Sequence, residues 1–279
     1  MISRYEIGIV ETRNVIKALL DTYDYDFRDY ALTSLKRRLE DVITNNGLKD
    51  SEVLINRLQD NKVFFEQFLK DITPETTEMF RDPSLWRHLR EDLILDVVKN
   101  TSKPKVWVAA FDSGEELFSL CILLKEMCLL DQFQIYASIF SDETLKKIQQ
   151  GRIDVKQLEI NEANYDRSNC ISKYSEYHHI APATGSLTLD TKLIKDVTFI
   201  KQNTLYNNAP GGIRLALFRN QIIYYNQILQ DKTLNSIHNS LVAGGYLILG
   251  TKETLENTNA NNKFTVINET EKIYKKKTG

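Results

Sequence analysis

From residue 105 onward, short apolar runs alternate with stretches of helical periodicity. The apolar runs cover 105–111, 133–140, 197–201, 213–218 and 246–250, and helical stretches cover 114–130, 142–150 and 226–241. Strands that alternate with helices of crossover length form a mostly parallel sheet that is covered on both faces. This alternation predicts a doubly wound α/β fold, which binds ligands at the carboxyl ends of its strands. Residues 264–268 and 272–276 are expected to close the chain as a hairpin.

Residues 1–98 have a different rhythm, which is typical of helices. Leu32, Leu35, Leu39, Val42 and Ile43 fall on one helical face, and Gly47 follows as a stop signal. A proline turn at residue 83 opens another helical stretch, and the polar segment 99–105 ends it. We therefore predict an N-terminal helical domain, 1–98, followed by an α/β domain, 99–279.

Residues 153–195 break the strand–helix alternation. They show no long helical period, carry Tyr165, Tyr174 and Tyr177, and end in the alternating pattern SLTLDTKL. Period-two alternation indicates a strand with one buried face. The segment is predicted to be a small inserted β-subdomain.

Composition excludes several classes of protein. The net charge of −2 gives no reason to expect nucleic-acid binding, and no apolar run approaches the roughly 18–20 residues that span a bilayer. Three cysteines are too few for a disulfide framework, and the four histidines lack metal-site spacing. These features predict a cytoplasmic protein with reduced thiols, no metal and no membrane insertion.

Residues 112–116, DSGEE, follow the first predicted strand, where a ligand would sit. A single glycine and two acidic residues do not make a phosphate-binding loop, because the acids would repel a phosphate and tolerate a cation. The alternative is a plain helix start, whose first-turn acids complement the helix dipole. These residues alone leave both interpretations open.

Five segments resemble motifs of the CheR family, the chemotaxis-receptor methyltransferases that use S-adenosylmethionine. They are TPETTEMFRDPSLW (73–86), WVAAFDSGEELFSL (107–120), VTFIKQNTL (197–205), FRNQIIYY (218–225) and AGGYLILGTKETL (243–255). Their order and spacing agree with the family from about residue 15 to the end. The resemblance implies a Rossmann-like, doubly wound methyltransferase sheet with an N-terminal all-helical domain and a small inserted β-subdomain.

The resemblance also implies roles for individual residues. Glu116 would bind the ammonium at the methionine end of the cofactor, and Arg219 and Asn220 would lie near the transferring methyl group. Arg81 and Tyr224 would hold the acceptor carboxylate and are the implied catalytic pair. The implied cofactor-binding set is Thr77, Arg81, Glu116, Asn203, Thr204, Arg219 and Asn220, and no metal is implied.

The implied reaction is methyl transfer from S-adenosyl-L-methionine, which leaves S-adenosyl-L-homocysteine, to glutamate side chains of a receptor. The partner would be the cytoplasmic domain of a chemotaxis receptor, and the protein is expected to be a monomer. Lys36, Arg37 and Arg38 lie on the helix that resembles the family's receptor-docking helix, where cations would steer an acidic partner. An ordinary solvated helix face is the alternative for these three residues.

The chain departs from the family pattern at several positions. Ile139 stands where the family has an aspartate that accepts both ribose hydroxyls; the other departures are Glu75, Phe111, Asp112, Arg214 and Lys252. Hydrogen bonds to a charged group contribute about 1.5–3 kcal/mol each, so the loss at Ile139 could weaken cofactor binding by one to three orders of magnitude. Two hypotheses follow: an active carboxyl methyltransferase with an altered pocket, or a degenerate relative that binds a partner or ligand without methyl transfer.

Overall fold

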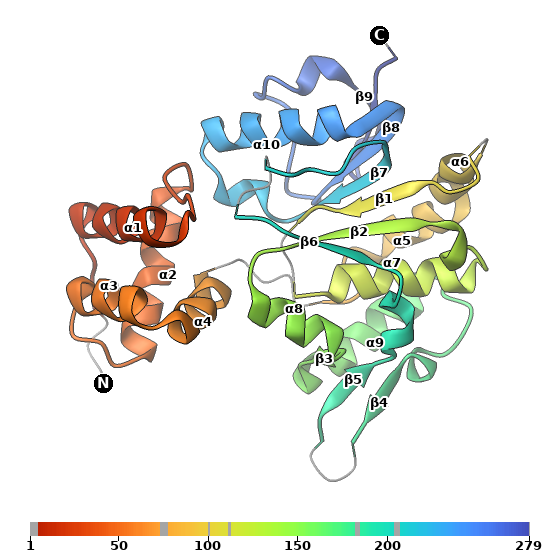
Figure 1. Cartoon of the computed structure of the whole chain (residues 1–279). Helices are drawn as coiled ribbons and strands as arrows, with labels where there is room; N and C mark the ends of the chain where they lie inside the picture. The colour runs from red at the N-terminus through yellow and green to blue at the C-terminus, as the bar shows by residue number, and fades with distance from the viewer. Residues whose placement is uncertain are drawn as a thin grey trace.

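A computed structural model describes residues 5–72, 78–99, 101–110, 113–181, 185–203 and 207–278. Four helices, α1 (Ile9–Tyr23), α2 (Leu32–Asn45), α3 (Ser51–Asp60) and α4 (Lys62–Ile72), form a helical unit beside the sheet (Figure 1). The predicted helical face of α2 is buried, with Leu35, Leu39, Val42 and Ile43 in its core. The helical prediction for this part of the chain is confirmed.

The rest of the chain is built around a seven-stranded sheet in the order β6-β2-β1-β7-β8-β10-β9. Its strands are β1 (Lys105–Val108), β2 (Gln134–Ile139), β6 (Thr198–Lys201), β7 (Ile213–Phe218), β8 (Leu241–Leu249), β9 (Phe264–Asn268) and β10 (Ile273–Lys276). Neighbours from β6 to β8 run parallel, and β10 is antiparallel to both β8 and β9. The predicted doubly wound sheet and its closing hairpin are confirmed.

Helices cover both faces of this sheet. On one face lie α7 (Glu115–Glu126) and α8 (Asp142–Gln149), whose buried side chains share a core with those of β2. On the other face lies α10 (Gln227–Ser240), whose core is continuous with that of the N-terminal helices. The short 3₁₀ helices are η2 (Leu130–Gln132), η3 (Val155–Gln157), η4 (Tyr174–Glu176), η5 (Thr191–Ile194), η6 (Ile222–Tyr224) and η7 (Asn261–Lys263).

One continuous helical stretch precedes β1 and belongs, by its packing, to the sheet. It consists of α5 (Pro83–His88), a π-helical turn η1 (Leu89–Leu93) and α6 (Ile94–Val98). Trp86 and Ile94 share a core with α7 and not with α1–α4. We therefore propose that the border between the two domains lies before Met79, and not at residue 98 as the sequence suggested.

The inserted segment does contain a small antiparallel sheet, in the order β3-β5-β4. Its strands are β3 (Arg152–Ile153), β4 (His178–Ile180) and β5 (Leu187–Leu189), and it projects from the end of the molecule distant from β9 (Figure 1). The segment also contains a helix, α9 (Leu158–Arg167), although its sequence shows no long helical period. Its buried residues are Asn161, Asn164 and Tyr165, so hydrophobic periodicity could not reveal it.

Candidate active site

The site lies at the carboxyl ends of β1 and β7. These neighbouring strands mark the point where the strand order reverses, which is where doubly wound sheets bind ligands. The chain turns from β1 into α7 through Gly114, whose φ is 107°. A Cβ at Gly114 would lie 2.9 Å from Cγ1 of Ile148 on α8, so this turn requires glycine.

Arg219, directly after β7, is the buried centre of the site and is only 1% exposed. Its Nη1 donates to Oε2 of Glu116 over 3.2 Å, and its Nη2 donates to Oδ2 of Asp82 over 2.6 Å. The same Nη2 donates to the Arg81 carbonyl over 3.1 Å. Arg219 thus joins the first turn of α7 to the segment that precedes α5.

Three residues around Arg219 have left-handed backbone conformations without being glycine. They are Phe80 (φ 51°), Asp82 (φ 59°) and Asn220 (φ 58°). Residues held in sparsely populated conformations cost about 1–3 kcal/mol each and cluster at functional sites. The packing around Arg219 therefore holds a locally strained backbone in place.

Glu253 fixes the turn that follows Arg219. Its two carboxylate oxygens accept hydrogen bonds from the amides of Asn220 (2.8 Å), Ile222 (2.8 Å) and Gly250 (2.7 Å). A Cβ at Gly250 would lie 2.7 Å from Oδ1 of Asn220, so the two turns touch closely. Nδ2 of Asn220 is buried and has no hydrogen-bond partner in the described part of the chain, so it is available to a ligand.

Burial dominates the electrostatics of both acids. It raises the pKa of Glu116, an effect that the Arg219 guanidinium opposes and the nearby Glu253 carboxylate reinforces. Burial also raises the pKa of Glu253, against the hydrogen bonds from the backbone amides. Burial therefore opposes the charged form of both acids, and Arg219 is the cation that pairs with Glu116.

Arg81 is half-buried beside this network. Its carbonyl accepts from Arg219 and, over 2.9 Å, from Nε1 of Trp86. Among the described residues, its guanidinium has no ion-pair or hydrogen-bond partner. The structure thus leaves the Arg81 guanidinium available at the site where the sequence predicted a carboxylate-holding group. Its catalytic role stays a prediction.

Other predicted residues contact the N-terminal helices. The Arg38 guanidinium lies 5.0 Å from the Tyr224 ring centroid and donates to the Ile72 carbonyl over 3.0 Å. Arg38 is therefore an interdomain contact, and Lys36 lies 3.7 Å from Glu40. Asn203 donates to the carbonyl of Asp24 over 2.5 Å and to its carboxylate over 3.1 Å.

Roles for Tyr224 and Asn203 in binding an acceptor or adenine stay predictions. Thr77 and Thr204 lie outside the described residues, as do Glu75, Phe111 and Asp112.

Ile139 is the last residue of β2 and only 2% exposed. In the family motif this position carries the aspartate that accepts the ribose hydroxyls. Ile139 packs in the core that the sheet shares with α7. Sequence reasoning missed a buried polar chain beside it: Trp107 Nε1 donates to Ser138 (2.9 Å), and Ser138 donates to Gln202 (2.6 Å). Buried polar residues at strand ends were the available signal.

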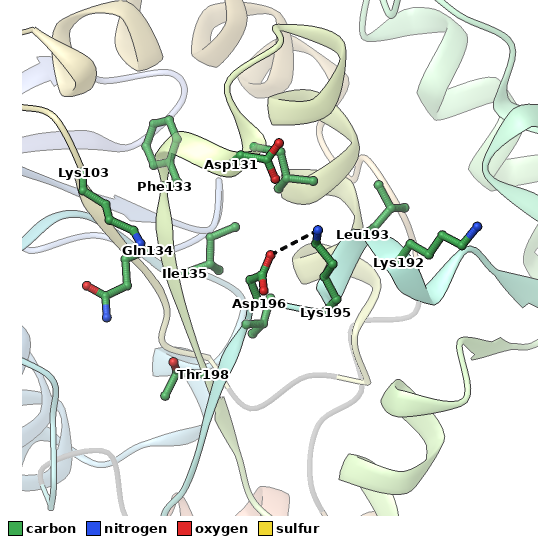
Figure 2. A pocket seen from close by; sticks show the side chains of 12 residues that line it. Lys103, Asp131, Phe133, Gln134, Ile135, Lys192, Leu193, Lys195, Asp196 and Thr198 are labelled. Carbon is green, nitrogen blue, oxygen red and sulfur yellow. Dashed lines mark ion pairs between the residues drawn. The ribbon is translucent and has the colours of Figure 1, made fainter.

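The opposite ends of the strands carry a separate pocket of about 300 Å³. It lies beside the first residues of β2 and β6, and the Lys195 and Asp196 side chains point toward one another there (Figure 2). Lys195 and Asp196 pair there over 3.6 Å. This pocket lies at the end of the sheet opposite to Glu116 and is not part of the candidate active site.

Two sequence profiles together match almost the whole chain. Residues 11–73 match the CheR methyltransferase all-alpha domain, and residues 75–273 match the CheR methyltransferase SAM-binding domain. The chain belongs to the CheR methyltransferase family. Membership agrees with the fold described above and makes this chain one of a family of S-adenosylmethionine-dependent methyltransferases.

Named relatives are moderately similar to this CheR-family chain. The Pseudomonas putida protein named Cher3 is 30% identical over 267 residues, which cover 96% of this chain and 97% of that protein. A chemotaxis protein methyltransferase of Listeria monocytogenes is 24% identical, covering 83% and 85% of the two chains. Chemotaxis protein methyltransferase 1 of Pseudomonas aeruginosa is 26% identical, covering 79% and 81%. The identities make this CheR-family chain a divergent one.

The residues at the site fit one end of the family's cofactor better than the other. The buried Glu116 carboxylate suits the polar amino-acid end of S-adenosylmethionine, as does Nδ2 of Asn220, which has no hydrogen-bond partner among the described residues. Where the family motif has a ribose-binding acid, the Ile139 side chain offers no hydrogen-bond acceptor. No cluster of three or more potential metal ligands occurs in the parts of the chain that the structure describes, and none of its described helices is long and apolar enough to cross a membrane.

Proposed function

We propose that this protein transfers a methyl group from S-adenosylmethionine to glutamate carboxylates on the cytoplasmic domain of a chemotaxis receptor. One observation carries the proposal: Arg219, Glu116 and Asp82 form an ion-pair network at the strand-order reversal, beside an Arg81 guanidinium that has no ion-pair partner among the described residues. The names of the Listeria and Pseudomonas aeruginosa relatives support the acceptor class.

The reaction would ask little of the protein's acid–base chemistry. A glutamate side chain is already ionised at neutral pH, so no general base is needed. S-adenosylmethionine supplies an electrophilic methyl group. Arg81 would hold the acceptor carboxylate with its planar, two-pronged guanidinium, which lysine cannot imitate. The buried surroundings of Glu116 and Arg219 would exclude water and fix the alignment, the main source of rate in such a reaction.

Partner binding without methyl transfer is the less favoured reading. Its one supporting observation is Ile139, a buried apolar side chain where the family motif has an acid. The intact Glu116–Arg219–Asp82 network argues against it, because a degenerate pocket has no need for a strained and charged centre.

The test combines calorimetry with a methyl-transfer assay on receptor cytoplasmic fragments. We expect S-adenosylhomocysteine to bind, and Arg81→Ala to lower kcat far more than it lowers cofactor affinity. Arg214→Ala is the matched control, since this half-buried arginine lies near the amino end of β7 and away from the site. A wild-type protein that binds no cofactor at millimolar concentration and modifies none of several receptors would overturn the proposal.

A further inference from the structure

The inserted subdomain forms hydrogen bonds with the backbone of Met79, two residues before Arg81. Oδ1 of Asn161 accepts the Met79 amide over 2.9 Å, and Nδ2 of Asn164 donates to the Met79 carbonyl over 3.1 Å. Both asparagines lie on the buried face of α9, with exposures of 0% and 4%. The two side chains therefore bind both polar groups of one residue, as a neighbouring β-strand would.

Two further contacts hold Met79 and Phe80, one from the inserted segment and one from α7. The Tyr174 hydroxyl, also in the inserted segment, lies 3.0 Å from Sδ of Met79. From the other side, Oγ of Ser119 on α7 accepts the Phe80 amide over 2.8 Å. Met79 and Phe80 are both fully buried. The path of the chain into Arg81 is thus set by α9 and α7 together.

This path ends in the strained turn. Phe80 and Asp82, on either side of Arg81, both have positive φ. Strain of this kind persists only when surrounding contacts over-determine the backbone. Asp82 is held by Arg219, whereas Met79, three residues earlier, is held by the two asparagines. Without the asparagines, the backbone before the turn would keep, among the described residues, only the Ser119 bond to the Phe80 amide and the packing of the Met79 and Phe80 side chains.

We propose that Asn161 and Asn164 are positioning residues, through which the inserted subdomain sets the direction of the Arg81 guanidinium. The inference rests on the proposed function, because Arg81 is the group assigned to the acceptor carboxylate. It gives the subdomain a part in building the active site.

Attachment of the subdomain does not depend on these two amides. Glu126 on α7 accepts hydrogen bonds from Arg90 and from the Tyr165 hydroxyl. It also accepts from the Tyr177 hydroxyl (3.3 Å) and the Ile171 amide (3.0 Å). This carboxylate, with its side chain only 1% exposed, anchors the subdomain independently. Removing the amides should therefore disturb Met79 without detaching the subdomain.

The experiment uses Asn161→Ala and Asn164→Ala in the full chain. A misplacement of about 1 Å can cost about 100-fold in rate, so we expect kcat to fall between tenfold and 100-fold. Affinity for S-adenosylhomocysteine should change much less. Glu162→Ala, on the exposed face of the same helix, is the matched control, and Tyr177→Phe controls for weakened attachment of the subdomain.

A double-mutant cycle with Arg81→Ala separates positioning from general structural support. If the asparagines act through Arg81, their loss should add almost nothing to kcat in a chain that already lacks the guanidinium. Additive effects on kcat would overturn the inference, as would equal losses in the Glu162→Ala or Tyr177→Phe controls.

Amide hydrogen exchange gives a readout independent of turnover. Asn161→Ala should remove protection at the Met79 amide, whereas Glu162→Ala should preserve it. Unchanged protection at Met79 would overturn the inference whether or not the protein transfers a methyl group. A different result would be a wild-type protein that transfers no methyl group, together with an Asn161→Ala variant that loses protection at Met79. This result would count against the proposed function, but it would support the hydrogen bonding of Met79 by the subdomain.

Discussion

Replacing Arg219 with methionine should be strongly destabilising. The side chain is 1% exposed, and Glu116, to which it donates, is 6% exposed. Removal of one partner from a buried ion pair costs about 3–5 kcal/mol, because the remaining charge stays buried without the opposite charge that compensated it. Asp82 should contribute less to this cost, since its side chain is 26% exposed and water can solvate it.

The penalty should depend on pH in a defined direction. Burial already raises the pKa of Glu116, and loss of the Arg219 cation would raise it further. An acid whose pKa is raised in the folded state favours folding at low pH, and this contribution is lost as pH rises through the folded pKa. The stability gap between Arg219→Met and wild type should therefore shrink as the pH is lowered from 8 toward 5.5.

Urea unfolding at the two pH values measures this gap, and Arg219→Met/Glu116→Gln tests its cause. Neutralising Glu116 should recover about 2 kcal/mol of the loss and remove most of its pH dependence. Arg214→Met on the same strand is the control and should stay within about 0.5 kcal/mol of wild type. A penalty that is the same at both pH values, or no recovery in the double variant, would show that Glu116 is not the stranded charge.

Three further changes test single features. Gly250→Ala would place a Cβ 2.7 Å from the Asn220 side chain and should lower the free energy of unfolding, measured in urea, by about 1–3 kcal/mol. An unchanged free energy of unfolding would contradict the close packing. Ile139→Asp should lower the melting temperature without creating a ribose site, because the new carboxylate would be buried and unpaired; tighter binding of S-adenosylhomocysteine in calorimetry would refute this. Burial alone would raise the pKa of Glu126, but hydrogen bonds from Tyr165, the Ile171 amide and Arg90 lower this pKa below the ordinary 4.5. The ionised Glu126 carboxylate therefore stabilises the fold above pH 4.5, and this stabilisation is lost as the pH falls below that value. Glu126→Gln should therefore reduce the acid sensitivity of thermal melting, and an unchanged pH profile would count against the anchor.

The elements that sequence predicted best are those with a strong hydrophobic period. The runs at 105–111, 133–140 and 213–218 became the buried strands β1, β2 and β7, because their apolar side chains face helices on both sides. β8 was predicted too short: it begins at Leu241, and its early residues include Gly244 and Gly245, which interrupt the apolar pattern without ending the strand.

The site was only partly predictable for a related reason. The family motifs placed Glu116 and Arg219 at strand ends, but they gave no indication that these side chains pair with each other and with Asp82. Such pairing depends on three segments that are far apart in sequence. Helix α9 escaped prediction because asparagine amides, and not apolar side chains, make up much of its buried face. Amides on a buried face signal a backbone that they must hold, here that of Met79.

The N-terminal part of the chain contacts the sheet at the ends of two strands. The Tyr25 hydroxyl donates to the Phe140 carbonyl over 2.8 Å, directly after β2, and the two rings meet edge to face with centroids 5.0 Å apart. Asp24 accepts hydrogen bonds from Asn203, two residues after the end of β6. Both contacts lie at the carboxyl ends of strands, the edge at which doubly wound sheets bind ligands. If Asn203 turned to bind adenine, it would give up its bonds to Asp24, so cofactor binding at that end and docking of the helical unit would compete for the same amide.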